Sequence, residues 1–131
     1  QLKMNFKIAE KSVSYGNAIK YKSFDFAVRI IKLYKFFRKN EASLDPILKQ
    51  LLRSGTSTGA NVHEAQGAIT KKDFINKLQI SLKEANETEY WINLLFKTEV
   101  LKVEQFDSLQ KDCQELIKLL TSILKSLKSN A

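Results

Sequence analysis

Hydrophobic residues recur at helical spacing in four stretches of the chain. The last stretch is the most regular, because its apolar positions alternate three- and four-residue steps from Phe106 to Leu127. The pattern predicts four helices, over residues 23–38, 46–69, 70–96 and 106–127. Helices of this kind with short connections are typical of an up-and-down antiparallel four-helix bundle, so we expect an all-α fold.

Residues that favour helix ends stand beside three of these stretches. Ser23 can cap the first helix, and the pair Asp45-Pro46 places proline at the first helical position of the second. Thr70 can cap the third helix in a variant of the capping box, with Asp73 in place of glutamate.

Residues 1–22 lack this helical period. A short alternation spans residues 5–8, Gly16-Asn17 is typical of a turn, and residues 18–21 fit a short strand. We therefore expect two parts, an N-terminal arm over residues 1–22 that is extended, irregular or briefly β, and a bundle domain over residues 23–131.

Small residues fill the second stretch between Ser54 and Ala60. Their composition suits a loop, but the apolar period continues across them, which predicts one unbroken helix. Small side chains let a neighbouring backbone approach closely, and this contact would offset the poor helix propensity of glycine.

The first helix carries more apolar residues than one core requires. Its polar residues fall within roughly a third of the helical circumference. The excess must be covered by the N-terminal arm or by another subunit. The candidate subunit contacts are Phe26, Ile30, Leu33 and Phe37.

Polar residues form rows along the second and third helices. Spacings of three and four place each row on one face, where the two rows can pair across the helices or line a groove for a ligand or partner. We favour structural pairing. The residues are Arg53, Ser57, Asn61 and Glu64 on the second helix and Lys77, Glu84, Glu87 and Trp91 on the third.

Charge is concentrated at the start of the chain. Ten lysines and arginines precede Asn40 against only Glu10 and Asp25, so this segment holds the whole net charge of +8. Such a surface can attract polyanions or can simply be a solvated face, and the residues leave both open. The candidate nucleic-acid contacts are Lys20, Lys22, Arg29, Lys32, Lys35, Arg38 and Lys39.

Little in the sequence points to catalysis, a metal or a cofactor. There is one histidine, His63, and a di-iron bundle would need at least two. Cys113 takes an apolar heptad position without a neighbouring base. A single cysteine suits a reducing compartment, and no apolar stretch approaches the roughly 20 residues of a membrane span. We expect a cytoplasmic, non-enzymatic protein without metal, cofactor or membrane partner.

Three segments resemble a known family, the 23S rRNA-intervening sequence proteins, also called four helix bundle proteins. The segments are residues 50–65 (QLLRSGTSTGANVHEA), 72–78 (KDFINKL) and 83–91 (KEANETEYW). Residues 23–34 also fit the family's opening helix, and the resemblance covers roughly residues 17–128. Thr58 replaces a usual isoleucine, and His63 stands at a commonly acidic or small position.

The resemblance implies a four-helix bundle that assembles as a homopentamer. A relative in fold, the accessory protein of diversity-generating retroelements, is a basic pentamer that binds nucleic acid and a reverse transcriptase. The family supplies no catalytic residues. We expect an oligomer that binds RNA or other nucleic acid through its basic surface. The alternative is a protein-interaction scaffold, for example for a reverse transcriptase, without a nucleic-acid role.

Overall fold

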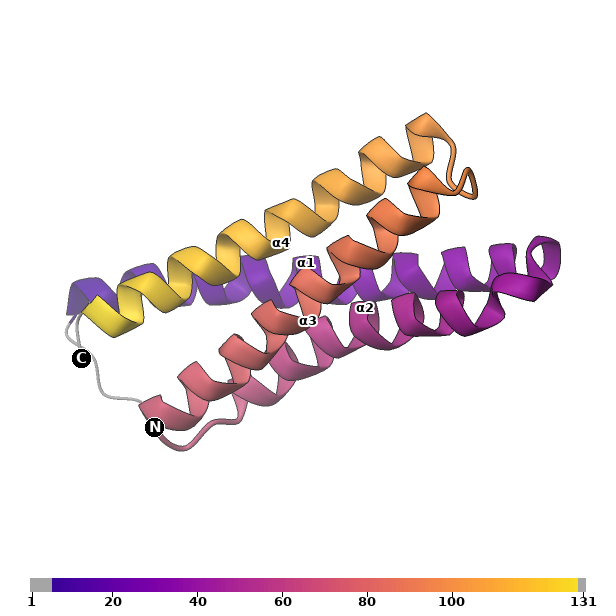
Figure 1. The fold of residues 1–131 in the computed structure, drawn as a ribbon. Helices are drawn as coiled ribbons and strands as arrows, with labels where there is room; N and C mark the ends of the chain where they lie inside the picture. Colours follow the sequence, from indigo (N-terminus) through magenta and orange to yellow (C-terminus); the bar gives the residue numbers. More distant parts are fainter. Residues whose placement is uncertain (1–5, 130–131) are drawn as a thin grey trace.

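Four long helices make up the computed structural model, which describes the backbone of residues 6–129 and the side chains of residues 17–129. They are α1 (Phe6–Asn40), α2 (Asp45–Gln66), α3 (Lys71–Lys97) and α4 (Val103–Ser129). A short 3-10 turn, η1 (Ala42–Leu44), joins α1 to α2. Each helix runs back along the one before it, and α4 returns beside α1 (Figure 1). The expected up-and-down four-helix bundle is confirmed.

The expected N-terminal arm is wrong for residues 6–22, which are helical and belong to α1. Neither a strand at residues 18–21 nor a turn at Gly16-Asn17 is present. Ile19 explains why, because it continues the core-facing row of α1 and is only 1% exposed. Ser23 does not cap the helix but lies inside it, buried, with its Oγ donating to the Lys20 carbonyl at 3.2 Å. The part of the arm over residues 1–5 lies outside the described residues.

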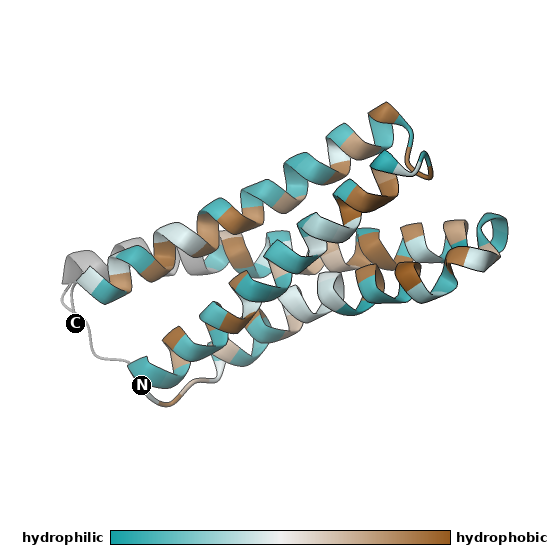
Figure 2. Cartoon of the chain, in the orientation of Figure 1, coloured by the Kyte–Doolittle hydropathy of each residue, from teal (hydrophilic) through white to brown (hydrophobic). Residues whose placement is uncertain are grey.

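One continuous hydrophobic core runs along the bundle, and Figure 2 places hydrophobic residues on the sides of the helices that face one another. Burying these side chains is the main force that holds the helices together. The heptad of α4 is confirmed, since six of its seven positions are buried. The seventh, Phe106, stacks on Phe96 of α3 with ring centroids 4.0 Å apart.

Small residues bring α1 and α2 into close contact, as the sequence predicts. A Cβ atom at Gly55 would lie 2.9 Å from Cγ1 of Ile30, and one at Gly59 would lie 3.0 Å from the Ser23 carbonyl oxygen. Both distances are shorter than ordinary side-chain contacts, so only glycine fits there without a shift. The segment over residues 54–60 is helical throughout.

Buried hydroxyl groups on the other side of α2 join it to α3. Thr88 donates to Ser54 Oγ at 2.9 Å, and Ser81 donates to the Thr58 carbonyl at 2.7 Å. All four residues are at most 1% exposed, so these hydrogen bonds satisfy groups that water cannot reach.

The structure confirms some of the predicted helix caps and ends and corrects others. Thr70 caps α3 as predicted, with its Oγ1 accepting from the Asp73 amide at 3.1 Å. Pro46 lies in the first turn of α2, but Asp45 does not cap this helix and accepts instead from the Tyr34 hydroxyl at 2.8 Å. The second helix ends at Gln66, not at residue 69, and Ile69 is 78% exposed.

Candidate functional surfaces

The basic residues of α1 divide into two groups. Lys22 pairs with Glu115 at 3.2 Å, and Arg29 pairs with Asp112 at 2.7 Å, so α4 partly neutralises both. Arg29 also donates to Ser108 Oγ at 2.8 Å. These two members of the predicted nucleic-acid set therefore hold α1 against α4. Their charges are less available to an outside polyanion than the charges of the other five residues.

Four of the remaining five cations gather at the C-terminal end of α1. Lys32, Lys35, Arg38 and Lys39 are all exposed and form what we name the basic end. Within residues 17–129 none of the four makes an ion pair. The Arg38 guanidinium carbon lies 5.8 Å from the centroid of the Tyr34 ring. Lys20, the fifth exposed cation, lies apart from this group, near Tyr21.

Four apolar side chains on α1 have no cover in the described structure. They follow the 3-4-3 spacing of one helix face, which we name the apolar stripe, and their exposed fractions are large for such residues. The stripe consists of Tyr21 (63%), Phe24 (67%), Val28 (36%) and Ile31 (43%). An uninterrupted row of this kind is typical of a surface that binds another protein chain.

The predicted subunit contacts are a different set, and the structure places them inside the chain. Phe26, Ile30 and Phe37 are at most 5% exposed and belong to the core, and Leu33 is half-buried against it. Phe26, Ile30 and Phe37 are therefore core residues with little surface left for a subunit contact, and for the half-buried Leu33 the contact stays a prediction. α1 does carry apolar surface that the core does not cover. This surface is the apolar stripe, which lies about half a turn around the helix from the core-facing residues.

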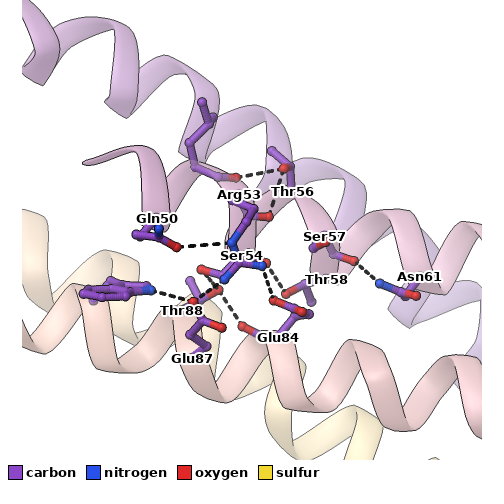
Figure 3. A network of polar contacts seen from close by, with 12 residues as sticks. Gln50, Arg53, Ser54, Thr56, Ser57, Thr58, Asn61, Glu84, Glu87 and Thr88 are labelled. Atoms are coloured by element: carbon purple, nitrogen blue, oxygen red, sulfur yellow. Dashed lines mark hydrogen bonds and ion pairs between the residues drawn. The ribbon is translucent and has the colours of Figure 1, made fainter. Parts of the chain in front are cut away.

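The polar rows of α2 and α3 pair with each other within the chain (Figure 3). Arg53 bridges Glu84 at 2.9 Å and also binds Glu87, which accepts from Trp91 Nε1 at 2.9 Å. The hydrogen bond from Trp91, and then the one from Arg53, hold the pKa of Glu87 below its ordinary value. This cluster helps to fix the register of the two helices. It agrees with the structural pairing that the sequence favours for these charged residues.

Of the rest of the polar set, Lys77 and Glu64 extend this pairing, whereas Ser57 and Asn61 bond within α2. Lys77 bridges Glu64 at 2.9 Å, and this hydrogen bond raises the pKa of the lysine. Asn61 donates to the Ser57 carbonyl at 2.9 Å, within α2 itself (Figure 3). The charged residues of the two rows thus join α2 to α3 within one chain.

The groups with potential for chemistry are dispersed or inert. Burial raises the pKa of the Cys113 thiol to about 12, and its Sγ lies 3.4 Å from the Ala85 carbonyl oxygen. A thiol with so high a pKa carries almost no thiolate at neutral pH. Across residues 17–129 no three histidine, cysteine or acidic side chains come together as metal ligands. In the described helices no segment is long and apolar enough to cross a bilayer.

The arrangement defines a class of protein, a basic up-and-down four-helix bundle whose first helix keeps an uncovered apolar row. The profile of the 23S rRNA-intervening sequence protein family matches residues 17–122, and the chain belongs to this family. A solved structure, a protein of unknown function from the S23 ribosomal protein family of Bacteroides thetaiotaomicron, is similar. It shares 55% identity with a TM-score of 0.81, covering 85% of this chain and 98% of the other. No curated protein matches.

The sequence analysis did not identify the stripe residues as a contact surface, although their spacing is visible in the sequence. Tyr21, Phe24, Val28 and Ile31 repeat at the same spacing as the core row and interleave with it. A helix with two interleaved apolar rows shows an over-wide apolar face, and the width alone does not say which row is covered.

Proposed function

We propose that this protein is a non-enzymatic homo-oligomer that binds RNA through the basic end of each subunit. One observation carries the proposal: within residues 17–129, an uncovered apolar stripe of α1 leads directly into a cluster of cations that make no ion pair. The name of the family refers to 23S rRNA, but the proposal rests on the surface and not on the name.

The stripe supports association with further copies of the chain. It runs for almost three helical turns, and burial of each side chain would contribute on the order of 1 kcal/mol. A closed ring covers the same stripe on every copy, which removes it from water without leaving an open end. The homopentamer that the family resemblance implies is one such ring.

The basic end supports contact with phosphates. Lys32, Lys35 and Lys39 lie on one side of α1 at three- and four-residue spacing. In a ring this group repeats once per subunit, so weak contacts with one RNA molecule would add through multivalency. Binding of this kind is independent of base sequence and weakens steeply as salt increases.

RNA binding to the assembled protein, measured at several salt concentrations by fluorescence anisotropy, tests the proposal. The informative variant is K32Q/K35Q, because both lysines precede the last turn of α1 and so leave the end of the helix unchanged. The control is K118Q/K125Q, which removes two exposed lysines of α4 that make no ion pair in the described structure.

The expected result is a lower affinity and a shallower salt dependence for K32Q/K35Q alone. Loss of two phosphate contacts per subunit should reduce the slope of log affinity against log salt by about 1.4 for each subunit that contacts a single-stranded RNA. Equal effects of both variants would indicate general electrostatics. Wild-type protein that binds no RNA at low salt would refute the proposal.

The scaffold alternative has less support. It would use the polar rows of α2 and α3, whose charged members already bind one another within the chain. We propose a cytoplasmic location, because a single free cysteine suits a reducing compartment.

A further inference from the structure

One exposed aromatic side chain of α1 belongs neither to the core nor to the stripe. Phe36 is 57% exposed and lies at a groove of about 340 Å³ between α1 and α4. The groove is open to solvent. The residues that line the groove are Arg29, Lys32, Leu33, Phe36, Phe37 and Gln105.

The Phe36 ring packs against the ring of its neighbour Phe37. Phe37, which is 5% exposed, meets it edge to face, with ring centroids 5.0 Å apart and planes at 81°. Both residues lie within regular helix, so the position of the ring does not depend on a loop. A planar group can therefore stack on Phe36 at little cost in ordering the protein.

Positive charge flanks the ring on both sides. Lys32 lies one turn before Phe36 and Lys39 lies one turn after it, on the same side of the helix. Neither lysine makes an ion pair within residues 17–129. An aromatic ring between unpaired cations is typical of surfaces that bind single-stranded nucleic acid, where bases stack and phosphates meet the charges.

Gln105 adds a hydrogen-bond donor on the opposite wall. Its Oε1 accepts from the Lys102 amide at 2.8 Å, which directs the side-chain oxygen toward the protein backbone. Its Nε2 has no hydrogen-bond partner among the described residues and can donate to the carbonyl of a base.

We infer that the groove between α1 and α4 takes one unpaired base of a single-stranded RNA, which stacks on Phe36 while Lys32 and Lys39 bind the adjacent phosphates. The inference rests on the proposed function and narrows it from RNA in general to single strands. A duplex keeps its bases stacked inside and can reach the lysines but not the ring.

Phe36→Leu tests the inference, because leucine keeps an apolar side chain on the helix but removes the stacking face. The matched control is Tyr90→Leu, which removes a ring of similar exposure, 58%, from α3. The probes are a short single-stranded RNA that contains 2-aminopurine and a duplex of the same length. Anisotropy gives affinity, 2-aminopurine fluorescence reports stacking, and circular dichroism with light scattering confirms fold and mass.

The expected result is a change in 2-aminopurine fluorescence on wild-type protein that Phe36→Leu abolishes, and a loss of about tenfold in single-strand affinity in Phe36→Leu with duplex binding unchanged. If both RNAs bind and Phe36→Leu matches wild type, the inference is overturned while the proposed function stands. Failure of wild type to bind either RNA overturns both. A changed mass or equal losses on both RNAs would assign Phe36 to packing or to a protein contact instead.

Discussion

Replacement of Gly55 by alanine tests the close approach of α1 and α2 on which the bundle depends. In an ordinary helix this change stabilises by about 1 kcal/mol, because alanine has the better helix propensity. Here the new Cβ would lie 2.9 Å from Cγ1 and 3.1 Å from Cγ2 of Ile30. Ile30 is completely buried and β-branched, so it has little room to move away.

The size of the effect follows from these two opposing contributions. Overpacking of a dense core costs about 1–3 kcal/mol, which exceeds the gain in helix propensity. We expect Gly55→Ala to lower the free energy of unfolding by about 1 kcal/mol. Gly67→Ala is the control, because a Cβ there would lie 3.7 Å from its nearest neighbour, an ordinary contact.

A double-mutant cycle identifies the cause. Ile30→Ala removes the atoms that the new Cβ would meet, and it costs about 2–5 kcal/mol by itself. In that background Gly55→Ala should stabilise by up to about 1 kcal/mol, so the effect of the same substitution changes sign. Urea unfolding at one fixed protein concentration measures all four variants. Stabilisation by Gly55→Ala in the wild-type background would refute the close contact.

Further predictions concern single groups. The pKa of Glu87 is lowered in the folded state from its ordinary value of 4.5, so its contribution to stability is present above that pH and disappears as the pH falls through the folded value. Glu87→Gln should therefore lose less stability than wild type between pH 7 and pH 3.5, as the urea midpoints will measure. Trp91→Phe removes the indole donor to Glu87 and should cost about 1 kcal/mol of stability, with a smaller pH dependence as its signature. Cys113, whose thiol pKa is about 12, should react with a disulfide reagent only after unfolding, and fast reaction of the native protein would contradict its burial.

Much of the fold could be predicted from local patterns. The α4 heptad, the Thr70 cap and the helical path through residues 54–60 all depend on spacings of three and four within one helix. The pairing of Arg53 with Glu84 and Glu87 also follows, because rows on facing helices must meet if the helices are antiparallel neighbours.

The features that were missed depend on tertiary contacts. The extension of α1 before Ser23 rests on burial of Ile19, whose neighbours in sequence are polar or small and give a weak periodic signal. The pairing of Lys22 and Arg29 with acidic residues of α4 was missed, because the register between the first and last helices is set by the packing of the whole bundle and not by a short connection. Which apolar row of α1 faces the core is likewise decided by the whole bundle.

The central claim is that the apolar stripe joins copies of this chain, and sedimentation velocity over a range of protein concentrations tests it most directly. Wild type should sediment at a multiple of the 15.1 kDa subunit mass, and the variant F24Q/I31Q, helical by circular dichroism, should sediment as the single subunit. A wild-type protein that sediments at 15.1 kDa even at the highest concentration would contradict the account.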